Sequence, residues 1–373
     1  MKNVLVIGNA TSIWIKEYIR NVHGKLGNRV YLTNYFGMNQ EDKLFYEQLN
    51  VEIINFKATN KVCKFAEYNY VLNKFIKRHK GQIDVVDIQS PPNSKQADII
   101  KKTVDNLGAK SVVTFWGSDI MRIDSKGAKR MKKLLKQAKV INIGTEKMHE
   151  KFKSYYNEEF DDKCVYIGFG SPAITNIRDC KLSKEECKMH FGLDKNKIVV
   201  AIGYNGRREQ QHLSAIKAFS KLDKELKDKI QILIHLGYGF DIDYKNEIKS
   251  LLEQSELNYV INEDMLDLEQ VAILRIATDV FVHSQTTDGL SGSIREVVYA
   301  GAILLNPEWI KYDKFDKDGV EYVVYNDFNN LTEKMTDILK GKIKIDKIKN
   351  RKILYAEYSW ESVEDRWASM LDA

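Results

Sequence analysis

The chain has 373 residues, more than one ordinary hydrophobic core holds, so we expect two domains. Hydrophobic residues make up 43% of the sequence and charged residues 29%, as in globular proteins, and no apolar run reaches the 18 residues of a membrane-spanning helix. Residues 1–170 contain 29 Lys and Arg against 18 Asp and Glu, a net charge of +11, whereas residues 171–373 carry −5, which gives the total of +6. The basic first half favours an anionic partner, such as a phosphorylated acceptor or an acidic membrane surface, although an ordinary solvated surface gives the same pattern.

The first residues and the cysteines indicate the compartment. The apolar run within residues 1–7 is only four residues long, too short for a signal peptide, which predicts a cytoplasmic protein. Cys63, Cys164, Cys180 and Cys187 show neither a Cys-x-x-Cys pair nor a histidine at the spacing of a zinc site. We therefore expect reduced, structural thiols.

Alternating strands and helices organise the predicted first domain. Short apolar runs typical of buried parallel strands occur at residues 2–8, 29–33, 51–56, 84–89, 111–114, 140–144 and 164–168. Amphipathic helices are expected after Thr11 or Ser12, either of which would cap the first helix, and at residues 68–78 and 126–139. This order predicts a parallel, doubly wound sheet. The first turn, Gly8-Asn-Ala-Thr-Ser12, lacks the Gly-x-Gly-x-x-Gly pattern, so no nicotinamide or flavin dinucleotide is expected there.

The loop after the strand at 111–114 reads Phe115-Trp-Gly-Ser-Asp119 and lies at the carboxyl edge of the sheet, where open α/β sheets bind ligands. Trp116 and Asp119 should therefore face a cleft, although a place in the core accounts equally well for Trp116. The next helix has an apolar stripe and seven basic side chains elsewhere. It could lie on an anionic membrane, but a solvated face on a helix packed against the sheet is the favoured interpretation.

A second domain is predicted after the glycine-rich segment 168–172. Its strands are expected at 198–203, 230–237, 259–262, 279–283, 302–307 and 322–325, and its helices at 213–219, 244–252, 268–275, 291–300, 331–339 and 359–371. The turn 204–212 contains the adjacent pair Arg207 and Arg208, and two arginines at a strand-to-helix turn are typical of a phosphate clamp. Asp241-Ile-Asp243 has no third acid nearby, so we interpret it as solvated loop acids rather than a metal site.

The stretch Ser284–Gly301 is expected to form the centre of the functional site, because a strand leads through small residues into a helix there. The N–H groups of Leu290 to Ser293 have no partner within that helix, and the helix dipole adds partial positive charge, so a phosphate fits. Asp288 precedes the helix, and Glu296 lies inside it, roughly 7 Å further along the axis. The two acids can therefore face groups on opposite sides of a phosphate. Gly301 should end the helix with a positive φ.

With these motifs in place, the sequence resembles the retaining glycosyltransferases of the GT-B fold, the group 1 family that includes sucrose synthase and bacterial cell-surface polysaccharide sugar transferases. The family motif is an acid, seven residues and a glutamate, followed by a short helix that ends at glycine, and Asp288, Glu296 and Gly301 match it. The resemblance implies two facing Rossmann-like α/β domains. Residues 1–170 would bind the acceptor, with a C-terminal crossover helix at 358–373 packed back on them, and residues 171–357 would bind the donor.

The resemblance also implies roles for individual residues. Asp288 would contact sugar hydroxyls, the N–H groups of Leu290 to Ser293 would hold a diphosphate, and Glu296 would bond the ribose. The donor-binding set is Gly203, Asn205, Met265, Gly289, Leu290, Ser291, Gly292, Ser293 and Glu296; the acceptor-binding set is Thr11, Trp116, Gly117 and Ser118; the catalytic set is Asp119, Arg207, Arg208 and Asp288. No cofactor and no metal are implied, because arginine and amide dipoles do the work of a cation.

The sequence departs from the family in two places. The family usually grips the diphosphate with an arginine and, about five residues later, Lys-Gly, so that here Arg207 or Arg208 must substitute. Trp116 stands roughly where many members have a histidine.

The implied activity is that of a hexosyltransferase acting in the cytoplasm or peripherally on the inner face of the membrane. It would move a sugar from a nucleotide diphosphate sugar, above all a UDP-sugar, to a cell-envelope glycan or lipid-linked acceptor, with no nucleic acid as partner. Two alternatives stay open, a nucleotide-sugar 2-epimerase of the same fold and a non-catalytic protein that binds nucleotide sugars or polyanions.

Overall fold

The computed structural model describes residues 1–34, 38–57, 61–239 and 241–373, apart from the side chains of residues 61, 62, 64, 118 and 147. The chain divides into two compact units. Unit 1 comprises Met1–Gly170 and Val363–Ala373, and unit 2 comprises Ser171–Ser362. Each unit is built around its own parallel sheet, as the alternation of strands and helices in the sequence predicts.

Unit 1 contains a seven-stranded sheet in the order β3-β2-β1-β4-β5-β6-β7, in which all described pairs are parallel. The strands are β1 (Asn3–Ile7), β2 (Arg29–Asn34), β3 (Val51–Asn55), β4 (Val85–Gln89), β5 (Lys110–Thr114), β6 (Val140–Asn142) and β7 (Cys164–Val165). The strand order reverses between β1 and β4, which makes the sheet doubly wound in the Rossmann manner.

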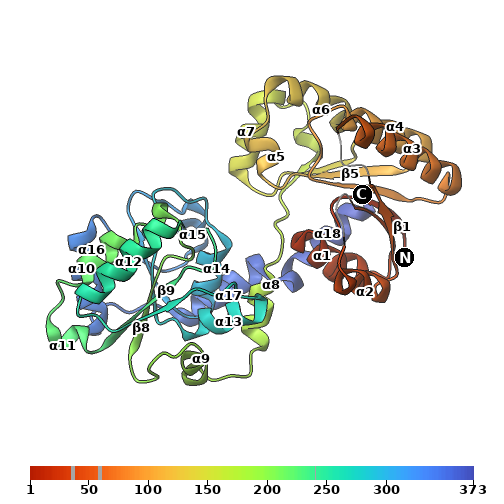
Figure 1. The fold of residues 1–373 in the computed structure, drawn as a ribbon. Coiled ribbons are helices and arrows are strands. Elements are labelled where there is room, and N and C mark those ends of the chain that lie inside the picture. Colours follow the sequence, from red (N-terminus) through yellow and green to blue (C-terminus); the bar gives the residue numbers. More distant parts are fainter. Residues whose placement is uncertain (35–37, 58–60, 240) are drawn as a thin grey trace. The chain divides into compact units, whose positions relative to one another are not determined.

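The helices of unit 1 cover both faces of its sheet, with α3, α4 and α6 on one face and α1, α2 and α18 on the other (Figure 1). They are α1 (Ile13–Tyr18), which continues as the π-helical turn η1 (Ile19–Gly24), α2 (Gln40–Gln48), α3 (Lys61–His79), α4 (Gln96–Leu107), α5 (Ser118–Met121), α6 (Ser125–Gln137), α7 (Glu146–Tyr156), the 3-10 turn η2 (Asp161–Lys163) and α18 (Trp360–Asp372). Leu5 and Ile7 of β1 pack in the core beside α3, α4 and α6, and Val4 and Val6 are buried on the opposite face. Burial on both faces explains the continuous apolar runs.

Helix α18 completes the core of unit 1. Trp367 is fully buried, and its ring centroid lies 4.8 Å from that of Tyr18 and 5.1 Å from that of Phe169. Its indole N–H donates to the carbonyl oxygen of Gly168 at 3.1 Å. Large buried aromatic rings of this kind contribute strongly to core stability. Residues 363–373 are therefore an integral part of the first core.

Unit 2 contains a six-stranded parallel sheet in the order β10-β9-β8-β11-β12-β13. The strands are β8 (Ile198–Ile202), β9 (Ile230–His235), β10 (Tyr259–Asn262), β11 (Val280–Val282), β12 (Ile303–Pro307) and β13 (Val323–Tyr325). The order is that of a dinucleotide-binding Rossmann sheet, and it reverses between β8 and β11. The carboxyl ends of these two strands therefore mark the expected position of a ligand.

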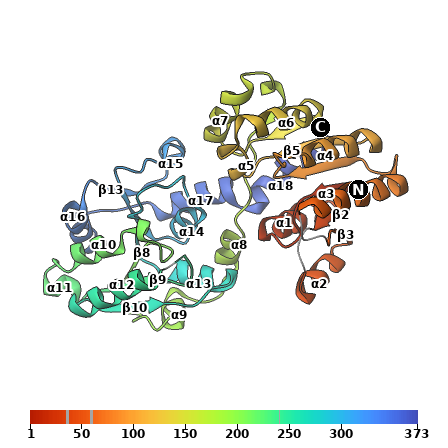
Figure 2. The same ribbon diagram turned by 45° about the horizontal axis from the view of Figure 1, so that its top comes forward.

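The helices of unit 2 form two cores, one on each face of the sheet. They are α8 (Pro172–Asp179), α9 (Lys184–His190), the 3-10 turn η3 (Arg208–Gln210), α10 (His212–Phe219), α11 (Lys224–Lys227), α12 (Ile242–Gln254), α13 (Leu268–Ala277), α14 (Gly292–Tyr299), α15 (Asp313–Asp318), α16 (Phe328–Leu339) and α17 (Lys347–Tyr358). Val199 and Ala201 of β8 pack with α13 and α14, whereas Val200 and Ile202 pack with α10 and α12. Figure 2 shows α10 and α12 next to each other on this second face.

Most predicted elements are present, with four differences. Helix α3 begins at Lys61, several residues before the predicted start at 68. Ser12 is the N-cap residue of α1, but its side chain makes no capping hydrogen bond. The predicted C-terminal crossover helix is α18, which begins at Trp360, and a helix that was not predicted, α17, directly precedes it and ends at Tyr358. Asp241 and Asp243 are exposed, as predicted, but Asp243 lies within α12, and Asp241 caps that helix by accepting the N–H of Tyr244 at 2.6 Å.

The basic helix α6 packs its apolar stripe into unit 1. Met131, Leu134 and Leu135 are fully buried, so this stripe is not free to enter a bilayer. Lys132 pairs with Glu159 at 2.5 Å, on the outer side of the helix. The solvated-face interpretation of α6 therefore fits the structure better than insertion of its apolar stripe. No helix among the described residues is long and apolar enough to cross a membrane.

Candidate functional site

Two loops of unit 2 are bound to each other at the point where the strand order reverses. One loop follows β8 and the other follows β11, which lie side by side in the sheet. The Ser284 hydroxyl donates to the carbonyl oxygen of Gln210 at 2.6 Å, and the Gln211 side-chain amide donates to the carbonyl oxygen of Ser284 at 2.6 Å. The N–H of Thr286 donates to the carbonyl oxygen of Glu209 at 3.0 Å. The predicted arginine turn and the predicted Ser284–Gly301 stretch therefore form one structural site.

Gly203 ends β8 in a conformation and a space that only glycine fits. Its φ is +66°, and a Cβ atom there would lie 2.8 Å from His212 Nε2 and 2.9 Å from Gln210 Oε1. His212 is fully buried, and burial lowers the pKa of its imidazole to about 4. The neutral ring packs directly under the turn that carries the arginines.

Asp288 is fixed by neighbouring hydroxyl and amide groups. The Tyr312 hydroxyl donates to Asp288 Oδ2 at 2.6 Å, and the N–H of Ser291 donates to the same oxygen at 3.0 Å. The Tyr204 hydroxyl lies 3.5 Å from Oδ1. Burial, followed by the hydrogen bond to the carboxylate, raises the pKa of Tyr312 well above its usual range. Oδ1 is therefore the less occupied oxygen of the carboxylate.

The N-terminus of α14 has free amide groups, although fewer than predicted. Ser291 is the N-cap residue, and its own N–H is used by Asp288. Within the described part of the chain, the N–H groups of Leu290, Gly292 and Ser293 have no acceptor. Leu290 has a φ of +66°, which is strained for a branched side chain and is typical of functional sites. Three of the four predicted N–H groups are thus available to an anion. At the other end of α14, Gly301 follows the helix with a φ of +98°, as predicted.

Arg207 and Arg208 have different environments. The Arg208 guanidinium bonds Asp241 at 3.0 Å and Glu247 at 2.8 Å, and it lies 4.7 Å from the centroid of the Tyr244 ring. Arg207 has no ion-pair partner among the residues that the structure describes, and its backbone N–H is fixed by Asn205 Oδ1 at 3.0 Å. Two carboxylates compensate the charge of Arg208, whereas the charge of Arg207 remains available.

Arg275 is a candidate site residue that the sequence analysis missed. It lies on α13, it is only 7% exposed, and its guanidinium donates to the Ser293 hydroxyl at 2.9 Å. Its Nε lies 3.4 Å from Glu296 Oε2, while the Ser171 hydroxyl donates to Glu296 Oε1 at 3.2 Å. Arg275 therefore fixes both a residue of the helix N-terminus and the acid inside the helix. An arginine within an apolar run is the signal that could have revealed it, because buried arginines are nearly always paired.

Asp119 and Trp116 hold the loop after β5 in unit 1. The Asp119 carboxylate accepts the N–H of Trp116 at 2.9 Å and the N–H of Gly117 at 2.9 Å. Burial raises the pKa of this carboxyl group, and these hydrogen bonds oppose the shift. The Trp116 indole N–H donates to Gln89 Oε1 at 3.1 Å, and the ring is half-buried. The polar groups of Trp116 and the carboxylate of Asp119 therefore have partners within unit 1.

The other predicted site residues occupy loops at the sheet edges. Thr11 lies in the loop after β1, where its hydroxyl accepts the Asn9 side-chain amide at 2.9 Å. Gly289 is exposed in the loop before α14, and Met265 is 72% exposed in the loop between β10 and α13. Ser118 begins α5, but its side chain is outside the described part of the structure. The predicted acceptor residues thus lie in unit 1 and the predicted donor residues in unit 2.

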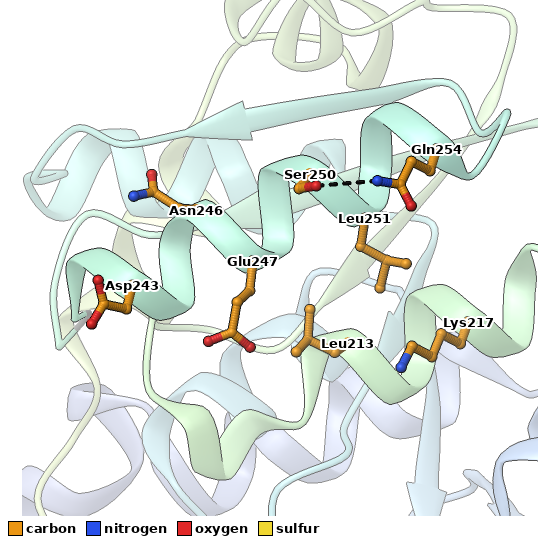
Figure 3. Close-up of a pocket in the computed structure, with 8 residues that line it drawn as sticks. All are labelled: Leu213, Lys217, Asp243, Asn246, Glu247, Ser250, Leu251 and Gln254. Atoms are coloured by element: carbon orange, nitrogen blue, oxygen red, sulfur yellow. Dashed lines mark hydrogen bonds between the residues drawn. The ribbon is translucent and has the colours of Figure 1, made fainter.

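An open groove of about 490 Å³ lies elsewhere in unit 2, between α10 and α12 (Figure 3). None of the predicted site residues lines it. Its walls come from two helices; the lining residues are Leu213, Lys217, Asp243, Asn246, Glu247, Ser250, Leu251 and Gln254. Glu247 also accepts a hydrogen bond from Arg208. The groove therefore lies beside Arg208, the ion-paired arginine, and has no lining residue bonded to Arg207.

No family model matches the chain, and no curated protein sequence matches it. Solved structures are similar over its whole length. Anabaena Alr3699/HepE in complex with UDP and glucose has a TM-score of 0.69 at 13% identity, with 100% of each chain covered. A glycosyltransferase from Rickettsia africae ESF-5 has a TM-score of 0.76 at 14% identity, with 100% of this chain and 98% of that chain covered. Sucrose-phosphate synthase from Thermosynechococcus elongatus has a TM-score of 0.67 at 10% identity, with the same coverage.

These similarities establish the fold. The chain has two Rossmann-like α/β domains in the manner of the GT-B glycosyltransferases, as the sequence predicts. Identities of 10% to 14% carry the fold and not the activity, because one fold supports many functions.

Proposed function

We propose that the protein is a metal-independent glycosyltransferase of the hexosyltransferase type that uses a nucleotide diphosphate sugar, above all a UDP-sugar, as donor. The acceptor would be a glycan or lipid-linked molecule of the cell envelope, and the anomeric configuration of the sugar would be retained. The site for the donor would be the pair of loops after β8 and β11 in unit 2. The alternation of α/β units and the HepE structure with bound UDP support this donor class.

The observation that carries the proposal is the grouping of free positive charge with two fixed acids at one sheet edge. Arg207 has no described ion-pair partner, and the N–H groups of Gly292 and Ser293 are free at the start of α14. Asp288 precedes these amides, and Glu296 follows them. A diphosphate fits the amides and the arginine, and sugar hydroxyls on either side of it fit the carboxylates.

The chemistry follows from where charge develops. The bond between the sugar C1 and the phosphate oxygen breaks, and negative charge grows on the departing diphosphate. Arg207 and the α14 amides stabilise this charge without a metal ion. The acceptor oxygen bonds C1 on the same face, and its proton passes to the departing phosphate oxygen. Asp288 Oδ1 holds a hydroxyl of the transferred sugar, and Glu296, fixed by Arg275, holds the ribose.

The acceptor would bind at the carboxyl edge of the first sheet, where Thr11, Trp116 and Gly117 lie. Half-buried aromatic rings such as Trp116 offer a flat apolar surface for a sugar ring. The basic outer face of α6 would attract the protein to an anionic membrane that carries such acceptors. Salt-sensitive binding to anionic vesicles, without insertion of the buried stripe of α6, is the expected form of this association.

A donor screen followed by product analysis tests the proposal. Unfolding midpoints would be measured with UDP-, GDP-, ADP- and dTDP-sugars, because a ligand at about 100 times its Kd stabilises by about 2.7 kcal/mol. We expect a UDP-sugar to give the largest shift, and Glu296→Ala to reduce it. Glu308→Ala is the matched control, since Glu308 is an exposed acid after β12.

NMR of the products then separates the reactions. A released nucleoside diphosphate and a retained anomer on the acceptor are the expected products. An isomerised donor that forms without any acceptor would instead establish a 2-epimerase. Binding without turnover of any donor would establish a binding protein and contradict the proposal.

A further inference from the structure

Unit 1 contains a cluster of three different metal-binding side chains away from the residues discussed so far. His149 lies on α7, Asp161 lies in the turn η2, and Cys164 is the first residue of β7. One ligand atom from each lies within 4.8 Å of the other two. The three positions are separated by 11 and two residues in the sequence, a spacing unlike that of a Cys-x-x-Cys zinc motif.

Each of these side chains is already held in place. His149 Nε2 lies 3.0 Å from Asp161 Oδ1, and His149 Nδ1 is hydrogen-bonded to the Tyr166 hydroxyl. Lys153 Nζ lies 2.7 Å from the other oxygen of Asp161, and the Cys164 thiol donates to the carbonyl oxygen of Phe160 at 3.1 Å. All three candidate ligands are half-buried, so an ion could reach them and water could fill a fourth position.

We propose that His149 Nε2, an Asp161 oxygen and Cys164 Sγ bind a divalent transition-metal ion of the zinc class. Imidazole, thiolate and carboxylate are the ligands that zinc prefers, and three protein ligands with one water make a common site. Zinc bond lengths imply ligand separations of roughly 3.3 to 3.6 Å in a tetrahedron. His149 and Asp161 are already closer than this, and the other two pairs, which lie within 4.8 Å, need a contraction of at most about 1.5 Å.

The acids around the cluster are paired with lysines. Residues 158–162 read Glu-Glu-Phe-Asp-Asp, and of the acids in this segment Glu159 pairs with Lys132 and Lys136, whereas Asp161 pairs with Lys153. Metal binding at Oδ1 leaves Lys153 on Oδ2, so the ion pair need not break. The Cys164 thiol releases its proton on binding, and His149 Nδ1–H donates to Tyr166.

A structural role fits this position. Strand β7 is an edge strand of only two residues, Cys164–Val165, and it is joined to the sheet through β6 alone among the described strands. The metal ion would connect α7, η2 and β7, and it would thus attach this short strand to the helix before it. The ion would stabilise unit 1 and would take no part in the transfer reaction.

Cobalt is the probe for the test, because Co²⁺ bound to a thiolate absorbs in the near ultraviolet and tetrahedral Co²⁺ absorbs strongly in the visible. Chelator-treated full-length protein is expected to take up one equivalent of Co²⁺ with both bands, and Zn²⁺ should displace it. Cys164→Ser should lose the near-ultraviolet band. Tyr166→Phe should weaken binding by roughly 10- to 100-fold, the usual loss for a partner of a metal-bound histidine.

Matched controls separate this cluster from other ligands. Cys63→Ser and His190→Gln change an exposed cysteine and an exposed histidine, and both variants should bind Co²⁺ like the wild type. Added Zn²⁺ should raise the unfolding midpoint of the wild type but not that of Cys164→Ser, even where the two metal-free proteins unfold at similar temperatures. Absence of the thiolate band, or its survival in Cys164→Ser, would overturn the proposal.

Discussion

The carboxyl edges of the two sheets share a topology but differ in how their polar groups are satisfied. At the first edge, Asp119 accepts two backbone N–H groups of its own loop, and the Trp116 indole donates to Gln89. At the second edge, Arg207 and the amides of Gly292 and Ser293 have no described partner. The polar groups of Trp116 and Asp119 at the first edge are thus paired with neighbouring groups of unit 1. Arg207 at the second edge has no counter-charge among the described residues.

This difference indicates which edge is suited to a charged ligand. Arg207 is exposed and unpaired, so an anion can bind it without first breaking an ion pair. A loop whose polar groups are already satisfied can bind a neutral molecule by shape and aromatic contact. We therefore expect a charged ligand at the second edge and a largely neutral one at the first.

Removal of the free charge should have the largest effect. We expect Arg207→Ala to lower the kcat/KM of sugar transfer by about 100- to 1,000-fold, because loss of one group that stabilises developing charge costs about 3 to 4 kcal/mol. Arg208→Ala is the control, since two acids already compensate that guanidinium, and it should lower kcat/KM less than about 10-fold. Equal losses in both variants would remove the distinction between the two arginines. Release of nucleoside diphosphate is the measurement.

The buried imidazole behind the second edge should make that edge sensitive to acid. The pKa of His212 is about 4 in the folded protein and 6.5 ordinarily, so between these pH values the unfolded chain binds the extra proton. Stability from this group is therefore complete above pH 6.5 and is lost as the pH falls toward 4, by about 3 kcal/mol in total. Urea unfolding of the wild type and His212→Asn at pH 7 and pH 4.5 should show a smaller decrease for the variant. His190→Asn, at an exposed position, should behave like the wild type.

The ion pair behind α14 should be sensitive to loss of one partner. Arg275→Gln leaves Glu296 without its cation, and we expect about 2 kcal/mol of lost stability, less than for a fully buried pair. The double variant Arg275→Gln/Glu296→Gln should recover most of the unfolding free energy but not the donor affinity. Arg275→Lys should retain more affinity than Arg275→Gln. Full donor affinity in the double variant would show that the pair serves stability alone.

The smallest effect is expected at the first edge. Asp119→Asn removes an acceptor oxygen from the loop, and we expect about 1 kcal/mol of lost stability in unit 1, with an unchanged Kd for UDP. Hydrogen exchange of the Trp116 and Gly117 amides is the local measurement. A folded Asp119→Asn protein without any transferase activity would instead assign this carboxylate a chemical role, as the family resemblance implies.

Apolar strands made most of the fold predictable. Buried parallel strands read as continuous apolar runs, and all of the predicted strands are present with small shifts at their ends. Helices with a weak apolar stripe were missed. Helix α17 buries only Asn350 and Leu354, and α2 buries only Asp42 and Tyr46. Helix α4 could have been found, because Ile100, Val104 and Leu107 lie on one face of it.

The part of the candidate site that consists of residues close together in the sequence was predictable. The loop from Ser284 into α14 supplies its own amides and acids, so its pattern is local. The choice between Arg207 and Arg208 was not predictable, because the acids that neutralise Arg208 are brought to it from α12 by tertiary packing. The zinc-class cluster was missed for the same reason, since its ligands meet only when α7 packs beside β7.

The place of Trp367 in the first core has a consequence for the order of folding. Tyr18 and Phe169 pack on this ring, so residues 1–170 contain a core that is incomplete until residues 363–373 have been synthesised. Domains usually fold from the N-terminus onward as the ribosome releases them. Here unit 2, which is continuous in sequence, can complete its fold first. Unit 1 is synthesised first, but its core is completed last.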